Sequence, residues 1–140
     1  MRRIARGLSG ALAAIAFASA APAGLTKEPF TIKTAQNLVD LCGADPADPL
    51  YDDAINFCHG YAAGAWQYHQ AEAAGPQGHR IVCLPDPPPK RGEAVAQFVT
   101  WAGSHPQYMN DPAVEALFRF LAEKWPCPEP APVEKKGTSK

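Results

Sequence analysis

The sequence lacks the patterns that mark most small redox proteins, zinc proteins and nucleic-acid-binding proteins. Its four cysteines, Cys42, Cys58, Cys83 and Cys127, form no Cys-x-x-Cys motif and no close pair of the kind that zinc sites use. The chain has 13 basic and 14 acidic residues, so it has no basic excess for nucleic acid. A Gly-rich phosphate loop is also missing. We therefore expect no metal, no cofactor and no nucleic-acid partner.

A catalytic nucleophile with a general base and an orienting group is missing as well. Cys58 and His59 are neighbours, but adjacent residues of a helix point in different directions, so adjacency alone does not make a nucleophile–base pair. We therefore expect that the protein is not an enzyme.

No segment alternates between apolar and polar residues with a period of two, and no internal repeat is present. Apolar residues instead recur at spacings of three and four, which is typical of helices packed on a core. The fold class that this pattern predicts is all-α, a small bundle of about four helices held by disulfides. The helices are expected at about residues 34–42, 52–74, 91–103 and 112–125.

Helix-capping signals support two of these boundaries. Thr34 is a suitable N-cap for the first helix, and Gly43 can close its end. The last helix has the clearest start, because Asp111 is a good N-cap and proline is favoured at the first helical position, which Pro112 would occupy. Pro126 stops that helix.

The N-terminus has the three parts of a secretory signal peptide. Three arginines within the first seven residues precede an apolar run at residues 8–17, and small residues follow. Residues 1–20 are the expected signal peptide, with cleavage after Ala20 or Ala23. The apolar run is too short for a permanent anchor, so the mature protein should not span the membrane and should reside in the periplasm.

The mature chain is expected to contain one domain. Residues 21–29 form an N-terminal tether, residues 30–127 the helical domain, and residues 128–140 a disordered tail that is proline-rich and then charged. Removing the three signal arginines changes the formal net charge from −1 to −4.

In an oxidising compartment, an even number of cysteines favours disulfides. Four cysteines allow three connectivities, of which we favour Cys42–Cys58 with Cys83–Cys127. The first pair would join the end of the first helix to the middle of the second. The second pair would fix the proline-rich linker to the end of the last helix.

Two local features each allow two interpretations. Gly60 and Gly64 lie four residues apart in a helix interior, where each glycine costs about 1 kcal/mol relative to alanine. They predict close helix packing, either with another helix of the chain or with a second protomer in a homodimer.

The second feature is an acidic cluster without any neighbouring lysine or arginine. It fits either a solvated loop beside a helix N-terminus or an acidic face for a basic partner. Its members are Asp40, Asp45, Asp48, Asp52 and Asp53.

Several motifs together resemble the Rap/Tai family of type VI secretion immunity proteins, over about residues 30–128. They are Thr34-Ala35, Cys42, Cys58-His59-Gly60-Tyr61-Ala62-Ala63-Gly64, Cys83-Leu84-Pro85, His105-Pro106 and Trp125-Pro126-Cys127. The resemblance implies a small, helical, periplasmic protein that neutralises a peptidoglycan amidase toxin. It also implies that homodimers are common. The alternative function is that of a periplasmic structural, stress or chaperone-like helical protein of the same fold that has no toxin partner.

An inhibitor needs a rigid scaffold and a projecting surface. The candidate projections are the loop at residues 73–80 and the turn at residues 103–111, with Tyr108 as an aromatic anchor for the partner. Trp66 and Tyr68 are further aromatic candidates on the second helix.

Overall fold

The computed structural model describes residues 24–128, which contain four α-helices, two short 3-10 helices and no β-strand. The prediction of an all-α bundle is confirmed. The helices in chain order are η1 (Glu28–Thr31), α1 (Ala35–Cys42), α2 (Tyr51–Ala73), α3 (Arg91–Gly103), η2 (Pro106–Tyr108) and α4 (Ala113–Lys124). The predicted bounds of α2 were one residue late at each end, and those of α3 are the same as in the structure.

The segments expected at the two ends of the chain lie partly outside the described residues. This applies to the expected signal peptide at residues 1–20, its cleavage site, and all but the first residue of the tail. The expected tether is described from residue 24, where it packs on the domain: the Leu25 N–H donates to Asp48 Oδ2 at 2.6 Å, and Pro29 is buried. No helix within residues 24–128 is long and apolar enough to cross a membrane.

The start of α1 is fixed by both local and distant backbone contacts. Thr34 and Asn37 form a capping box, in which each side chain accepts a hydrogen bond from the backbone of the other. The free N–H groups of Ala35 and Gln36 donate to the carbonyls of Asp111 and Met109, at 2.8 and 3.0 Å. The first turn of α1 is therefore completed by the segment that precedes α4.

This arrangement corrects the predicted start of α4. Asp111 was expected as the N-cap, but the helix begins at Ala113, with Pro112 at the cap position and no side-chain capping bond. Pro112 is extended, with ψ of 136°, because it pairs with Thr34 in an isolated antiparallel bridge. The tertiary contact with α1 thus moves the helix start by one residue.

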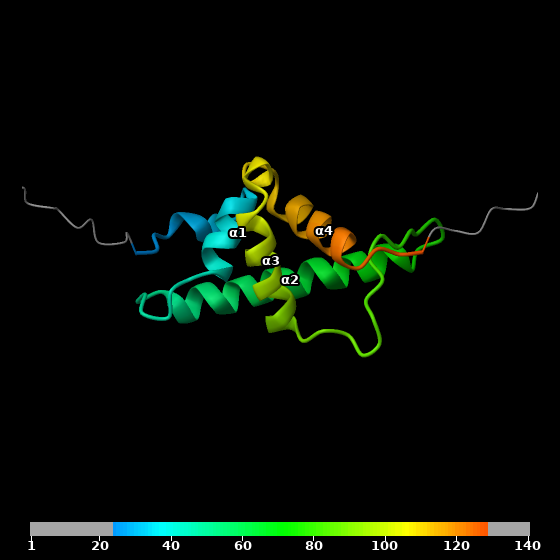
Figure 1. The fold of residues 1–140 in the computed structure, drawn as a ribbon, viewed down its shortest axis with the longest axis horizontal. Helices are drawn as coiled ribbons and strands as arrows, with labels where there is room; N and C mark the ends of the chain where they lie inside the picture. The colour runs from blue at the N-terminus through cyan, green and yellow to red at the C-terminus, as the bar shows by residue number, and fades with distance from the viewer. Residues whose placement is uncertain (1–23, 129–140) are drawn as a thin grey trace, which may run out of the picture.

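The core lies where α1, α3 and α4 meet above α2 (Figure 1). One cluster of buried side chains joins α1, α3 and α4, and its central Phe98 is 1% exposed. The other buried members of this cluster are Leu38, Val82, Ala113, Leu117, Phe120 and Leu121. A second cluster, formed by Leu41, Ala54, Cys58 and Val95, joins α1 to α2 and α3.

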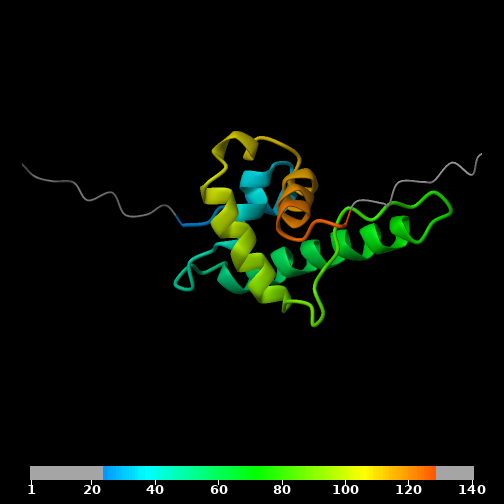
Figure 2. The same ribbon diagram turned by 45° about the vertical axis from the view of Figure 1, so that its right-hand side comes forward.

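Two disulfides connect the elements, in the connectivity that the sequence analysis favours. Cys42–Cys58 joins the end of α1 to α2, with 5.2 Å between the Cα atoms. Cys83–Cys127 joins the linker after α2 to the residues after α4, with 4.8 Å between the Cα atoms. The C-terminal part of α2 extends beyond the other helices, and the linker returns from it (Figure 2).

Candidate functional site

Within the described part of the chain, chemistry-bearing side chains are not gathered into a reaction centre. No group of three or more His, Cys, Asp or Glu residues there could hold a metal ion. All four cysteines are consumed in disulfides, so none of them offers a thiolate nucleophile. The features that remain to be examined are surfaces on which another macromolecule could bind.

The most prominent surface is the loop after α2, residues 74–81, which we call the distal loop. Every residue of this loop is exposed, including the apolar Ile81 at 43%. The loop turns tightly at Gly78, whose backbone lies against the end of α2. Only glycine fits there, because a Cβ atom would collide with the backbone carbonyl oxygens of Glu72 and Ala73. The loop corresponds closely to the projection expected at residues 73–80.

The distal loop is held at both ends. At its start, the N–H of Ala74 continues the α2 ladder by donating to the Gln70 carbonyl at 3.1 Å. At its end, Val82 is 2% exposed and forms an isolated bridge with Pro126. The N–H of Cys83 donates to the Trp125 carbonyl at 2.9 Å, beside the Cys83–Cys127 disulfide. The loop is therefore a projecting segment on a fixed base.

A histidine connects the base of this loop to the bundle. The His69 ring on α2 lies 5.5 Å from the Trp66 ring and 5.1 Å from the Phe118 ring of α4. Burial between these rings, and then the positive charge of Arg80 in the distal loop, lower the pKa of His69 from its ordinary value of 6.5. Folding thus shifts the protonation equilibrium of His69 towards the neutral ring.

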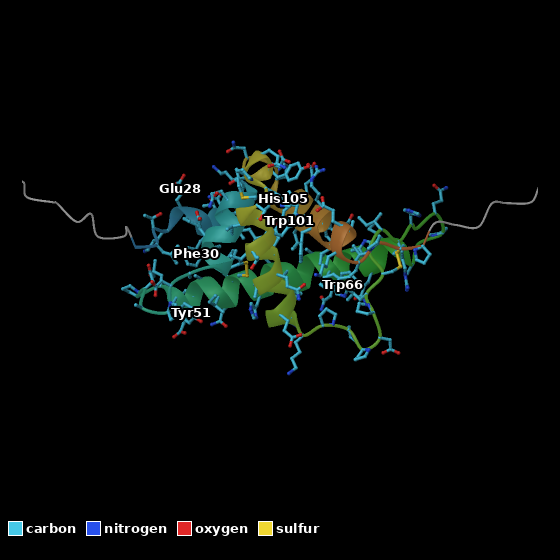
Figure 3. All side chains as sticks on the ribbon, in the orientation of Figure 1. Glu28, Phe30, Tyr51, Trp66, Trp101 and His105 are labelled. Carbon is cyan, nitrogen blue, oxygen red and sulfur yellow. A yellow bond between two sulfur atoms is a disulfide. The ribbon has the colours of Figure 1, made fainter. Side chains whose placement is uncertain are left out.

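The expected aromatic anchor, Tyr108, does not project freely. Its half-buried ring is nearly parallel to the rings of Trp101 and His105, with centroid distances of 5.8 and 5.9 Å. The Arg119 guanidinium carbon lies 4.3 Å from the centroid of the Tyr108 ring. Figure 3 shows Trp101 and His105 side by side at the end of α3. Tyr108 therefore stabilises the turn between α3 and α4 by packing.

This aromatic stack was not expected from the sequence, because its rings come from α3, from η2 and from His105 between them, and Arg119 of α4 lies over the Tyr108 ring. Polar contacts fix its edges: Trp101 Nε1 donates to Glu123 Oε2 at 2.8 Å, and Arg119 pairs with Glu115 at 2.8 Å. The signal that could have indicated it is the spacing of Trp101, His105 and Tyr108, which places three aromatic rings within eight residues.

The prediction of close packing at Gly60 and Gly64 within the chain is wrong. Both glycines are exposed, and a Cβ atom on either would meet nothing within 4 Å. Phe57 and Tyr68, which are 43% and 67% exposed, share this face of α2 because the four positions are three or four residues apart. We call these four residues the α2 face. The Phe57 end of this face meets Phe30 of η1, with 5.7 Å between the ring centroids, whereas the two glycines have nothing over them within residues 24–128. The alternative interpretation, a contact with a second protomer, stays a prediction.

Trp66, the other aromatic candidate of α2, is half-buried in a groove that the sequence did not reveal. The groove has a volume of about 460 Å³ and lies between α2, α3, α4 and the proline-rich linker. Its apolar lining includes Trp66, Leu84, Pro88, Pro89, Leu117, Phe120 and Trp125, and Gln67, Gln70 and Arg91 add polar groups. We call it the proline–tryptophan groove.

The acidic cluster borders a cleft of about 650 Å³ near the N-terminal end of the described chain. Three of its five carboxylates, those of Asp40, Asp45 and Asp48, accept local hydrogen bonds. Asp48 accepts from the N–H groups of Leu25 and Leu50, and Asp45 accepts from the N–H of Ala47. These bonds support the interpretation of a loop that shapes itself, rather than a face built for a basic partner.

A comparison with protein families agrees with the extent of this fold. A family model described as Rap1a immunity proteins matches residues 34–127, from the N-cap of α1 to the last cysteine. No curated protein and no solved structure shows a significant match.

Proposed function

The chain belongs to the Rap1a immunity protein family, and from this premise we propose that it binds and inhibits a peptidoglycan amidase toxin delivered by a type VI secretion system. Membership of the family implies a toxin as partner and a role in immunity. The amidase and its delivery system are the finer part of the proposal, and they rest on the sequence motifs given above.

We also propose that inhibition takes place in the periplasm. The N-terminal sequence has the parts of a secretory signal, and two disulfides suit an oxidising compartment. An amidase that cleaves cell-wall peptide would act in the same compartment, so toxin and inhibitor would meet there.

The observation that carries the proposed mechanism is the distal loop. It is exposed throughout, projects from the end of the longest helix, and is closed at its base by a disulfide. Because hydrogen bonds and a disulfide hold the two ends of the loop, less conformational entropy would be lost when it enters a toxin's cleft than for a free segment. Its basic Arg80 and apolar Ile81 are the residues that we expect to contact the toxin.

The test is a binding and inhibition assay with the mature protein and purified amidase toxins from its own and related strains. Replacing Arg80→Glu and Ile81→Asp together should weaken the affinity about thirtyfold or more, as for the loss of a central interface residue. Lys33→Glu is the matched control, since Lys33 is an exposed cation outside the distal loop. Failure of the unmodified protein to bind or inhibit any of these toxins would falsify the proposal and favour the structural or chaperone-like alternative.

We further propose that two copies associate through the α2 face. The glycines leave a shallow surface without side chains, and the exposed Phe57 and Tyr68 rings flank it. Light scattering of the mature protein should give the mass of a dimer, and Gly64→Arg should give the mass of a monomer. A monomeric mass for the unmodified protein would contradict this part of the proposal without affecting toxin binding.

A further inference from the structure

The proline–tryptophan groove is a binding surface that is separate from the distal loop. Ala63, Trp66 and Gln70 line it from one face of α2, since these positions are three and four residues apart. The start of α3, the C-terminal half of α4 and the prolines of the linker complete the lining, and none of residues 74–81 takes part in it. Its volume of about 460 Å³ lies within the range of ligand-binding pockets, about 300–1,000 Å³.

The two tryptophans of the groove carry hydrogen-bond donors without a partner in the described part of the chain. The indole N–H of Trp101, outside the groove, donates to Glu123 at 2.8 Å, whereas Trp66 and Trp125 make no such bond within residues 24–128. Neither of their N–H groups is among the buried polar atoms that lack a partner, so both are open to solvent. An indole N–H and the guanidinium of Arg91 can only donate. The groove therefore suits a ligand that offers hydrogen-bond acceptors.

The charge of the groove is of one sign. Arg91 is the one charged residue among the described residues that line it, although the chain as a whole has more acidic than basic residues. α3 begins at Arg91, so the positive end of the helix dipole lies at the same place. The nearby carboxylate of Glu93 does not line the groove and accepts from the N–H of Lys90 at 3.2 Å. An acidic side chain on the ligand would thus complement the groove.

Proline-rich segments combine these properties. In the polyproline II conformation the backbone makes no internal hydrogen bonds, so its carbonyl oxygens are available as acceptors, and proline has no N–H of its own. Aromatic-lined grooves bind such segments because the preformed conformation loses little entropy. We propose that the groove binds an extended, proline-rich and acidic segment of a partner protein, with proline rings against Trp66 and Trp125 and a carboxylate at Arg91. This contact leaves the distal loop free, so it would attach the protein to a second partner.

The first experiment is nuclear magnetic resonance of the mature protein without any toxin, so that its outcome is independent of the proposed function. The probe is the synthetic peptide acetyl-Glu-Pro-Pro-Pro-Pro-Glu-amide. The indole N–H resonances of Trp66 and Trp125 should shift until saturation, whereas the resonance of Trp101, which is bonded to Glu123, should not. A control peptide with glycine in place of each proline should bind about tenfold more weakly, because its flexible backbone must be ordered on binding.

The second experiment exchanges charges across the contact with Arg91. Because Arg91 is exposed, Arg91→Glu should leave the fold intact and weaken binding of the acidic peptide about threefold, as for the loss of an exposed ion pair. The same variant should bind a peptide with terminal lysines more tightly than the unmodified protein does. Lys33→Glu, which replaces an exposed cation outside the groove, is the control and should change neither affinity.

Three results would overturn the proposal. One is the absence of a saturable shift at Trp66 and Trp125, and another is equal affinity for the proline and glycine peptides. The third is a pair of indole shifts that follow the protein concentration alone, which would assign the groove to a second copy.

Discussion

The two disulfides lie in regions that differ in how they are held together. Cys42–Cys58 is in a packed region, where Cys58 is fully buried beside Leu41, Ala54 and Val95. Cys83–Cys127 is in the segment after α2, where Val82 is the one buried residue described between residues 74 and 90. The difference shows that the second bond does what side-chain packing does elsewhere: it fixes a segment that has almost no core of its own.

The loop-closure entropy of the two disulfides also indicates that the second bond constrains the chain more. Loop closure over the 16-residue separation of Cys42 and Cys58 stabilises the fold by about 3 kcal/mol. Closure over the 44-residue separation of Cys83 and Cys127 contributes about 4 kcal/mol. The distal bond is therefore the stronger constraint, although few side chains surround it.

The largest effect on this comparison is expected from a substitution that truncates a core side chain in the packed region. Phe98→Ala should lower the free energy of unfolding by about 3–5 kcal/mol, because Phe98 is 1% exposed and touches both Trp101 and Phe120. Val114→Ala, at a position that is 44% exposed, is the control and should cost about 1 kcal/mol or less. Urea denaturation measures both, and equal losses would show that the packed region is not the source of stability.

The next effect separates the two bonds. Cys83→Ala with Cys127→Ala should cost up to about 4 kcal/mol, yet it should leave the helical circular dichroism signal intact at low temperature. Cys42→Ala with Cys58→Ala should cost about 3 kcal/mol plus a cavity cost on the order of 1 kcal/mol, and it should loosen α1 from α2. Limited proteolysis should cut the first variant within residues 74–90. If cleavage started near α1 in both variants, the regional difference would be refuted.

Substitutions at three glycines should change the free energy of unfolding by smaller amounts, and in opposite directions. In dilute, monomeric protein, Gly60→Ala and Gly64→Ala should each raise the free energy of unfolding by about 1 kcal/mol, because each added methyl group meets open space in a helix interior. Gly78→Ala should lower stability, because its Cβ would collide with the carbonyl oxygens of Glu72 and Ala73. Thermal melts of the dilute, monomeric protein would reveal these signs. A destabilising Gly64→Ala in the monomer would contradict the open space around Gly64, whereas a loss of stability only at concentrations that form dimers would support the contact proposed for the α2 face.

The smallest effect is the pH dependence that His69 contributes. Since folding lowers the pKa of His69 below 6.5, the unfolded chain binds a proton more readily than the folded protein. The stability contribution is complete above pH 6.5 and declines as the pH falls through that value towards the lower folded pKa. His69→Phe should remove this part of the slope, and a melt series between pH 5 and 7.5 compares the two proteins. Identical slopes would exclude His69 as the cause.

The sequence predicted what local patterns determine. The spacing of apolar residues predicted α3 with the same bounds as in the structure, and Thr34 caps α1 as expected. The exposed position of the distal loop also followed from local signals, because Gly75 and Pro76 end the helix and polar residues follow. These features depend on neighbours in the sequence, so they could be inferred without knowing the tertiary contacts.

The errors lie where distant segments meet. The start of α4 depends on the bridge between Thr34 and Pro112, which joins residues 78 positions apart (112 − 34). Gly60 and Gly64 indicated a close approach, but a sequence does not show which face of a helix the other helices cover. The burial of Tyr108 depends on Arg119 from another element, and the proline–tryptophan groove combines four segments.

The hydrogen bonds between α1 and the segment before α4 also constrain the order of folding. A helix of eight residues is marginal on its own, and two N–H groups of α1 depend on carbonyls at Met109 and Asp111. A growing chain that has not yet reached these residues lacks the partners that complete its first helix. The domain therefore matures as a unit, late in the emergence of the polypeptide, and partial products should be open to proteases.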